Sequence, residues 1–524
     1  MLTTLTAPAF AKTWDIEKGD ITVKAGETGN DVTQNNVTTK NDTNTITTNQ
    51  KTDTASSHTV TIKTNDKNDT VEVTLKDVNI DASSRNEAAV SVTGSGNTTI
   101  KLDGDNHLTG GISDNGSYGL SGISSSGSLT ISGGETDSLT AQGGSGTDGS
   151  GGRGIFSKDL TISGGTVNAN GGDGKNGSGG SGITSLGSLT ISGGTVNAAG
   201  GDGTNSSDGG DGITNNRGVT ISSGGTVTTK GGSGDDGGSG VLIYSNGSLT
   251  VSGGTVTANG GNSGGIFNGG RGISSYGGVT VSGGTVNANG GDSEDGDGGS
   301  GIFSFDRVAI SGGTVEAAGG VGKNGSGGSG IYSSGIDLSG SLELTAKAGS
   351  PNGKALSQNG KELDLDTINK DKLDPGAKVT TTDADGKVIK QVSIPRPVEP
   401  EKPVIPEESS SSSDGGSSAP SAPVSSIPGL TVTDKDGQRI SYTSTQSGNT
   451  LTVCVGRFTA SLRASLSTLR QLRAEGIDTI TFQTILCSTT LSVDELLAMG
   501  GEDAEVVLTH HIRSSTLTVG GKAV

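Results

Sequence analysis

The stretch LTISGGTVNANGGDGKNGSGGSGI, residues 160–183, joins a short apolar run, a Gly-Gly pair, a second apolar run and a glycine-rich polar tract. The first apolar run recurs about every 30 residues, a spacing typical of solenoid proteins. Its copies begin at Leu129, Leu160, Leu189, Val219, Leu249, Val279 and Val308, with a degenerate copy at Ile336. The central part of the chain is therefore a tandem repeat.

Each repeat unit has the residue pattern of β-strands. Leu189 and Ile191 point to one side and Thr190 to the other, which is the two-residue period of a strand. A Gly-Ile pair opens most units, and Thr-Val-x-Ala follows the Gly-Gly pair. Three strands this short cannot bury an apolar face alone, but they can when units stack in register. The sequence predicts an all-β fold, a single-stranded parallel β-helix with rungs of about 30 residues.

The coil is predicted to extend over residues 12–394. Residues 12–110 form an N-terminal cap and looser rungs, 111–350 the regular glycine-rich rungs, and 351–394 the last rungs and C-terminal cap. The looser rungs are marked by alternating apolar runs at 59–62, 71–75, 78–80, 89–92 and 99–102. Glycine is expected at the corners, where φ must often be positive and side chains do not fit.

A different pattern follows the coil. Residues 395–429 are rich in Pro, Ser and Glu without periodicity, which predicts a disordered linker. Residues 430–524 are expected to form a small α+β module. Its predicted strands are 450–455, 479–485, 505–509 and 515–519. A first helix is predicted from the apolar face formed by Leu462, Leu466, Leu469 and Leu472, and it ends at Gly476. A second, short helix is predicted over 494–499.

Composition narrows the class of partner. The chain has 95 Gly, only 28% hydrophobic residues and 2% aromatic residues, values that suit either disorder or the thin core of a solenoid; the periodicity favours the solenoid. The net charge is −19 and no basic run exists, so nucleic acid and anionic membranes are poor partners. A neutral polymer is a more suitable partner for a chain with this negative charge, and so is an acidic polymer that is bridged to the chain by a cation. No apolar stretch is long enough for a transmembrane helix.

The N-terminus indicates export. Residues 1–11 look like the end of a signal peptide, since Ala9-Phe10-Ala11 has the small-x-small form of a cleavage site; an ordinary disordered terminus is the alternative. Export would place the protein outside the cell or on its surface, and would permit a disulfide between Cys454 and Cys487. Two buried free thiols are the alternative for this pair.

The motifs point to one family. VEVTLKDVNIDASSRNEAAVSVTGSGNTTIKLDGDNHLTGG at 71–111, the repeated LTISGGTV-x-A-x-GG, and Trp14 to Gly19 resemble exported bacterial carbohydrate-binding β-helix proteins, which are related in fold to pectate lyases. The resemblance covers roughly residues 13–350. It implies a right-handed coil, bound Ca²⁺, and binding of plant cell-wall polysaccharides such as cellulose or pectin without established lyase activity. SGGTV belongs to the scaffold and does not specify the ligand.

Aromatic residues suggest where a glycan would bind. The residue after each opening Ile should point outward, and this column is expected to read Ser124, Phe156, Thr184, Thr214, Tyr244, Ser274, Phe303, Tyr332, if Ile243 is the inward residue beside Tyr244. Exposed rings can stack on the flat faces of sugars. Phe156, Tyr244, Phe303 and Tyr332 are therefore the predicted ligand-binding residues. The alternative is simple strand propensity, since aromatic residues suit exposed strand positions.

The glycine tracts also carry acids that could hold Ca²⁺, which takes six to eight oxygen ligands. The best candidate set is Asp292, Glu294, Asp295 and Asp297. The alternative reading is that these are solvated loop charges.

Catalytic residues are harder to find. The regular repeats lack His, and Arg153, Arg217, Arg271 and Arg307 occur singly, so no acid–base pair converges in the sequence. We therefore expect a monomeric, non-catalytic polysaccharide-binding protein. A surface adhesin or structural spacer, and a calcium-dependent polysaccharide lyase, are the alternatives.

Overall fold

The computed structural model describes residues 12–395 except 28, 43–44, 48–53, 115 and 223, and, within 429–523, all but 435–437, 441, 448, 456–458, 485–487, 500, 502–503, 511–514 and 521. Residues 1–11 and 396–428, where the signal segment and most of the linker were predicted, lie outside the described residues. The chain divides into two compact units, residues 1–401 and 402–524. Each is described by itself.

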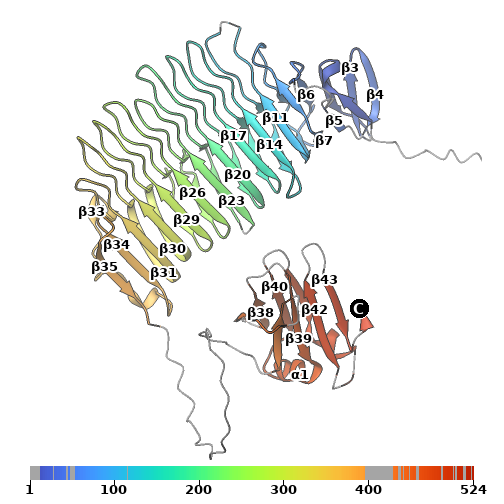
Figure 1. Cartoon of the computed structure of the whole chain (residues 1–524), viewed down its shortest axis with the longest axis vertical. Helices are drawn as coiled ribbons and strands as arrows, with labels where there is room; N and C mark the ends of the chain where they lie inside the picture. The colour runs from blue at the N-terminus through green and yellow to red at the C-terminus, as the bar shows by residue number, and fades with distance from the viewer. Residues whose placement is uncertain are drawn as a thin grey trace, which may run out of the picture. The chain divides into compact units, whose positions relative to one another are not determined.

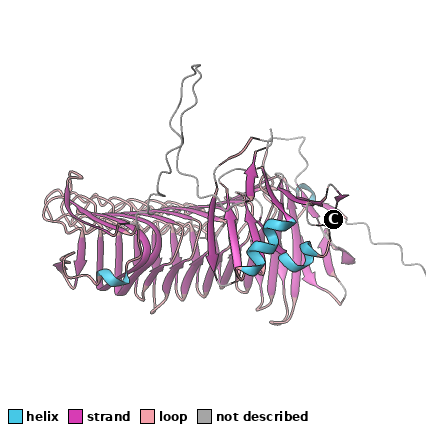
Figure 2. Ribbon diagram, turned by 90° about the horizontal axis from the view of Figure 1, so that it is seen from below, coloured by secondary structure: helices cyan, strands magenta, loops and turns pink. Residues whose placement is uncertain are grey.

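The first unit is a parallel β-solenoid of about 13 turns, which confirms the predicted fold class. Each regular rung has three strands, and each strand pairs in parallel with its equivalent one rung away (Figures 1 and 2). The first strands are β12 (Ile123–Ser125), β15 (Ile155–Ser157), β18 (Ile183–Ser185), β21 (Ile213–Asn215), β24 (Val241–Ile243) and β27 (Ile273–Ser275). The second strands are β13 (Ser128–Ser132), β16 (Asp159–Ile162), β19 (Ser188–Ile191), β22 (Gly218–Ile221), β25 (Ser248–Val251) and β28 (Val279–Val281).

The third strands complete each rung. They are β14 (Ser138–Gln142), β17 (Thr166–Asn170), β20 (Gly194–Ala199), β23 (Gly225–Lys230), β26 (Thr255–Asn259) and β29 (Thr285–Asn289). In the next two rungs the three strands run together as β30 (Ile302–Ala318) and β31 (Ile331–Lys347). Between the second and third strands the chain turns at glycines of positive φ, such as Gly165 at 77° and Gly194 at 76°, a conformation that favours glycine.

Equivalent apolar side chains stack along the coil. Leu160 is in register with Leu129 on one side and Leu189 on the other, and Ile162 lies beside Ile191. These side chains are at most 1% exposed, while Thr161 and Thr190 between them face outward. The rungs therefore enclose one continuous narrow core, as the two-residue period predicted.

The N-terminal region caps and starts the coil. The described strands are β1 (Thr13–Asp15), β2 (Ile21–Ala25), β3 (Asn30–Gln34), β4 (Val37–Asp42), β5 (Thr45–Thr47), β6 (Val60–Lys63), β7 (Thr70–Lys76), β8 (Asn79–Asp81), β9 (Val90–Thr93), β10 (Asn97–Asp103) and β11 (Asp105–Thr109), with the 3-10 helix η1 (Ile16–Lys18). β2, β3 and β4 pair in antiparallel fashion, and β2 also pairs in parallel with β6. Trp14 donates its indole N–H to Asp42 at 2.6 Å, which ties β1 to this cap.

The C-terminal end of the coil is also closed by antiparallel pairing. Its elements are β32 (Leu356–Gln358), β33 (Lys361–Glu362), η2 (Lys370–Lys372), β34 (Lys378–Thr382) and β35 (Val388–Ser393). β34 extends the third-strand sheet from β31, and β35 pairs with β34 in the opposite direction. A change from parallel to antiparallel pairing ends the run of stacked rungs at both ends.

The glycine tracts form an ordered ridge along the coil, which Figure 1 shows as a series of long loops. We define the glycine ridge as a series of glycines that are linked by backbone hydrogen bonds. The N–H group of each member donates to the carbonyl oxygen of the member before it, at 2.7–2.9 Å. Its members are Gly152, Gly172, Gly180, Gly201, Gly210, Gly232, Gly238, Gly261, Gly270, Gly291, Gly299, Gly320, Gly328 and Gly349.

The glycine ridge is built from glycine because the chains approach too closely for side chains. A Cβ on Gly180 would lie 1.9 Å from the Gly152 carbonyl oxygen, and one on Gly201 would lie 2.1 Å from that of Gly172. None of the ridge glycines has the positive φ that the sequence argument expected at corners. The tracts thus form a closely packed, hydrogen-bonded layer and are not only return loops.

The second unit is the predicted small module, with more strands than expected. Its elements are β36 (Leu430–Thr433), β37 (Thr443–Ser447), β38 (Thr450–Cys454), β39 (Ala460–Ser465), α1 (Leu466–Ala474), β40 (Thr479–Gln483), β41 (Ser488–Ser492), α2 (Val493–Leu497), β42 (Glu505–His510), β43 (Ser515–Val519) and β44 (Lys522–Ala523). Leu462 lies in β39, so its assignment to the helix was wrong. The helix begins after Ser465, whose hydroxyl accepts from Thr468 N at 3.1 Å as an N-cap.

The two cysteines belong to this module. Cys454, at the end of β38, carries a free thiol whose Sγ lies 3.4 Å from Gln483 Oε1. Cys487 lies outside the described residues; of the two predicted alternatives, a disulfide or two free thiols, the structure agrees at Cys454 with the free thiol.

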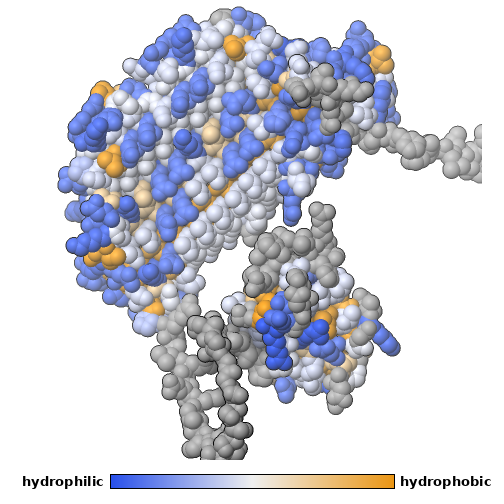
Figure 3. Space-filling view, viewed as in Figure 1, coloured by the Kyte–Doolittle hydropathy of each residue, from blue (hydrophilic) through white to orange (hydrophobic). Residues whose placement is uncertain are grey.

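The face of the coil seen in Figure 3 is mostly hydrophilic or near neutral, with hydrophobic residues in small separate patches. Within the described parts of the chain, no helix combines the length and the apolar character needed to cross a membrane.

Candidate functional site

The outward column after the first-strand Ile is present, but one member differs from the prediction. Phe303 is in register with Ser274 on one side and Tyr332 on the other. The residue aligned with Thr214 and Ser274 is Leu242, not Tyr244. Val241, rather than Ile243, is the equivalent of the opening Ile, since it pairs with Ile213 and Ile273. The sequence did not show this, because Val241 and Ile243 are both buried and no polar residue in the Val-Leu-Ile run marks the register. Placing Tyr244 in this column was therefore wrong.

Tyr244 instead starts a second aromatic column at the corner that follows the first strands. It lies three residues after Val241, just as Tyr276 follows Ile273 and Phe305 follows Ile302. These rings come from adjacent rungs and are 39%, 42% and 53% exposed. Sequence reasoning missed Tyr276 and Phe305, although their constant offset from the opening Ile was a readable signal.

The two columns join into one continuous aromatic surface. Ring centroids lie 5.5 Å apart for Tyr244 and Tyr276, 4.7 Å for Tyr276 and Phe305, 4.8 Å for Phe305 and Phe303, and 5.1 Å for Phe303 and Tyr332. We call these residues, Tyr244, Tyr276, Phe303, Phe305 and Tyr332, the aromatic platform. Such spacings are those of favourable aromatic pairs, so the rings hold one another in place.

Phe156 stands apart from the platform. It occupies the predicted outward column, in register with Ser124 and Thr184, but those neighbours are not aromatic. The Arg153 guanidinium lies 5.3 Å from the centre of its ring and donates to the Thr184 hydroxyl at 3.1 Å. Phe156 is thus packed in a local cation–π pair, and the structure does not bring it together with the other predicted residues.

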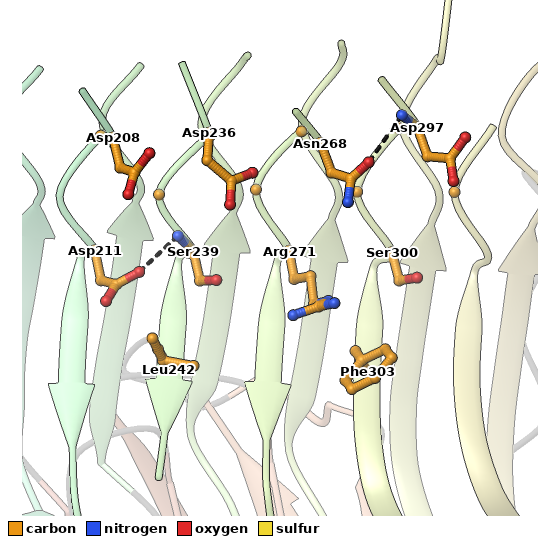
Figure 4. A pocket seen from close by; sticks show the side chains of 18 of the residues that line it. Asp208, Asp211, Asp236, Ser239, Leu242, Asn268, Arg271, Asp297, Ser300 and Phe303 are labelled. Atoms are coloured by element: carbon orange, nitrogen blue, oxygen red, sulfur yellow. Dashed lines mark hydrogen bonds between the residues drawn. The ribbon is translucent and has the colours of Figure 1, made fainter. Parts of the chain in front are cut away.

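A groove of 480 Å³ runs beside the platform (Figure 4). Tyr244, Tyr276 and Phe303 line it on one side, and backbone of the glycine ridge contributes to its wall. Figure 4 shows its polar side chains as two rows that run across the rungs, with one residue of each row on each rung. The rows are Asp208, Asp236, Asn268 and Asp297, and Asp211, Ser239, Arg271 and Ser300.

Arg271 is the cation of this groove. Its guanidinium lies 4.0 Å from the centre of the Phe303 ring, a close cation–π contact. Burial lowers the pKa of Arg271, while the nearby charge of Asp236 acts in the opposite direction. No hydrogen bond or ion pair joins the guanidinium to another described residue. Its planar set of N–H donors is therefore open to acceptors that enter the groove.

Asp211 is the most perturbed carboxyl of the groove. Its Oδ1 accepts from Ser239 N at 2.7 Å and its Oδ2 from the Thr214 hydroxyl at 2.8 Å. Part of its surface remains open, yet protein atoms surround the carboxyl closely, and this burial raises its pKa to about 6 in spite of both hydrogen bonds. Burial and the neighbouring charge of Asp208 also raise the pKa of Asp236.

The raised pKa of Asp211 predicts an effect on stability. The folded chain holds this proton more tightly than the unfolded chain, so the contribution of Asp211 to the free energy of unfolding falls as pH rises from 3.8 to about 6. Asp211→Asn removes the titration but keeps an acceptor for Ser239. We expect the variant to gain stability relative to the wild type across that window, measured by urea denaturation at a series of pH values. A difference that stays constant with pH would contradict the raised pKa.

The predicted calcium residues are each engaged by the next rung. Asp292 accepts from Val321 N at 2.7 Å, and Asp297 from Ser326 N at 2.8 Å. Glu294 pairs with Lys323 at 2.6 Å, and Asp295 accepts from Asn324 at 2.8 Å. Within the described parts of the chain, no group of three or more acidic, His or Cys side chains is placed to hold a metal ion. Each of the four side chains thus bonds to the following rung, and a shared Ca²⁺ site at these residues stays a prediction.

Many loop acids have the same structural role as Asp292. Asp173 accepts from Asp202 N at 2.9 Å, and Asp202 in turn accepts from Ser233 N at 2.7 Å. Asn262 performs this function for Asp292 N at 3.0 Å, which shows that the acceptor oxygen matters and the charge does not. The acidic residues of the tracts thus satisfy backbone donors between rungs.

Together the fold and the groove define a parallel β-solenoid with an aromatic and acidic groove on one side. No family model, no curated protein and no solved structure matches this chain. Of the family resemblance drawn from the motifs, the parallel coil is the part that the structure confirms.

Proposed function

We propose that this protein is an exported or cell-surface protein that binds polysaccharide without cleaving it, at the aromatic platform and its groove. The observation that carries the proposal is the concentration of rings. The chain has only 5 Tyr and 7 Phe, yet three Tyr and two Phe of the platform lie in continuous contact on neighbouring rungs. Elsewhere the same positions hold mostly polar residues, for example Ser124 and Thr214.

The shape of the platform favours a linear glycan as the ligand. Its rings follow the coil axis at intervals of one rung, roughly 4.8 Å. A polymer of sugars can place successive ring faces on such a surface, while its hydroxyl groups donate to the carboxylates of the groove. The plant cell-wall glycans implied by the sequence resemblance, cellulose and pectin, are the first ligands to test.

The platform can be tested by removing its three most exposed rings. We expect the triple variant Tyr244→Ala/Tyr276→Ala/Phe305→Ala to bind insoluble or soluble polysaccharide at least about tenfold more weakly, because each stacked ring contributes roughly 0.5–1.5 kcal/mol. Binding is measured by pull-down on cellulose and pectin and by affinity electrophoresis. Thermal denaturation should show that the fold is kept.

A matched control lies on another face of similar rungs. Thr190, Thr220 and Thr250 form an outward column on β19, β22 and β25. Their triple replacement by Ala should leave glycan binding unchanged. If the platform variant binds as well as wild type, or if the threonine variant loses binding equally, the platform is not the binding surface.

A glycan-cleaving activity is the second candidate function. It is favoured by one observation, the raised pKa of Asp211 in a groove, since a carboxyl that holds its proton near neutral pH can act as a general acid. Release of new reducing ends, or of unsaturated products that absorb in the ultraviolet, would establish it. Loss of that release in Asp211→Asn would assign the activity to this residue.

A further inference from the structure

The groove beside the platform carries more negative than positive charge. Asp208, Asp211, Asp236 and Asp297 line it, and Arg271 is the cation among its lining residues. No ion pair involves any of these four carboxyl groups among the residues that the structure describes. Each carboxyl can therefore still accept a cationic partner.

Two of these carboxyl groups have a raised pKa. The pKa of Asp211 and that of Asp236 are raised, in both cases first by burial. A nearby cation lowers the pKa of a carboxyl, so a cationic ligand would reverse the shift and gain binding free energy in doing so. Arg271 offsets only part of the charge of Asp236, and its guanidinium lies against Phe303.

A buried hydroxyl lies in the same outward column. Ser274 stands between Leu242 and Phe303, both of which line the groove, and it alternates with the inward Ile273 and Ser275. The Ser274 side chain is 0% exposed, and its hydroxyl has no hydrogen-bond partner among the described residues. A buried polar atom left without a partner costs free energy. Ser274 itself does not line the groove, so its hydroxyl belongs to the packing beside the groove and not to the ligand contacts.

We propose that the groove selects a glycan whose sugars carry free amino groups, such as a polymer of glucosamine. The proposal rests on the polysaccharide-binding function and deepens it. The sugar faces stack on the aromatic platform, and the ammonium groups donate to Asp208, Asp211 and Asp236. Each ammonium offers three donors, and the faces of Tyr and Phe rings attract cations as well.

Other glycan classes satisfy the groove less well. A uronic acid polymer would bring carboxylates beside four carboxylates, with only Arg271 to pair with, and like charges in a partly buried site repel strongly. A neutral polymer would keep the stacking on the rings but would offer no cation to the carboxylates of the groove. The charge of the sugar should therefore decide which glycan binds most tightly, while stacking on the aromatic platform contributes affinity for all three classes of glycan.

The experiment compares ligands that differ only in the amine. The full chain is titrated with glucosamine hexamer, N-acetylglucosamine hexamer, cellohexaose and galacturonate hexamer, with EGTA present, at low salt and at a pH just above the pKa of Asp211. We expect the free-amine hexamer to bind at least about tenfold more tightly than its acetylated form. That preference should shrink at about 0.15 M salt, because screening weakens charge interactions.

Variants test which residues provide the preference. Asp211→Asn/Asp236→Asn should reduce the preference for the free-amine hexamer over the acetylated hexamer. It should weaken the binding of cellohexaose much less, because the amide oxygens still accept from sugar hydroxyl groups. Asp173→Asn/Asp202→Asn removes two loop charges outside the groove and keeps their acceptor oxygens, so it should preserve the preference. A preference lost equally in both double variants would show that net charge, not the groove, is responsible, and would overturn the proposal.

The two proposals fail in different ways. If the acetylated hexamer, cellohexaose or the galacturonate hexamer binds as tightly as the free-amine hexamer and the platform variant loses that binding, the choice of amino sugar is wrong while the binding function stands. If no hexamer binds, or if the platform variant binds every hexamer as wild type does, both proposals are wrong.

Discussion

Gly180→Ala is expected to destabilise the coil by about 3 kcal/mol, at the upper end of the usual cost of overpacking. The new Cβ would lie 1.9 Å from the Gly152 carbonyl oxygen, which belongs to the backbone of the preceding rung. That oxygen cannot move away without breaking the hydrogen bond from Gly172 N, which is 2.8 Å long. One methyl group therefore disturbs two rungs at once. The measurement is the shift of the urea midpoint of the full chain, followed by far-ultraviolet circular dichroism.

The control is the same substitution at Gly264, in the tract of another rung. The nearest atom to a Cβ there is the Gly234 carbonyl oxygen at 4.0 Å, and the residue is exposed. We expect Gly264→Ala to change the unfolding free energy by no more than about 0.5 kcal/mol. Equal effects at Gly180 and Gly264 would mean that the glycine ridge is not closely packed.

Leu189→Asp is expected to have a still larger effect, above about 4 kcal/mol, because it buries an unpaired charge. Leu189 is 0% exposed and lies between Leu160 and Val219 in the stacked core. Neither neighbour offers a hydrogen-bond donor to a carboxylate. The variant should lose the cooperative unfolding transition of the coil or show it at much lower urea concentration, and native-state proteolysis should become faster.

Thr190→Asp is the matched control, one residue along the same strand. Thr190 faces outward in register with Thr161 and Thr220, so a carboxylate at this position stays in water. Its expected cost is below about 1 kcal/mol. A Thr190 variant as unstable as the Leu189 variant would contradict the inward and outward assignment on which the whole coil depends.

The sequence predicted the coil well because two signals agree in almost every unit. The alternation of Leu160, Thr161 and Ile162 marks the inward face, and the Gly-Gly pair marks the turn. The register is ambiguous only at Val241-Leu242-Ile243, where all three residues are apolar. There the pair Gly240-Val241, which stands in the place of the Gly-Ile opening of the other units, indicates the correct register. The period-two rule alone gave the wrong register for Tyr244.

The candidate site was predicted only in part. Phe303 and Tyr332 were placed correctly in the outward column. Tyr276 follows the end of β27, and Phe305 lies at the register shift within β30, so the two-residue period of the first strands does not reach either of them. The groove depends on Asp211 and Arg271, which both stand two residues before the opening Ile of their rungs. The repeat therefore carried their alignment, but sequence reasoning did not use this signal. The close packing of the glycine ridge could not be predicted from the sequence either. Glycine occurs both where two chain segments approach closely and where a turn needs positive φ, and the sequence does not distinguish the two cases.

Because each rung contacts mainly the rungs beside it, the coil can change length without being redesigned. Duplication of one coding unit of 29 or 30 residues would insert one more rung, lengthen the rod by roughly 4.8 Å, and leave the other junctions as they are. Unequal recombination between the near-identical units supplies such duplications. The groove spans only a few rungs, so the distance from the binding surface to either end of the rod can evolve separately from the ligand it recognises.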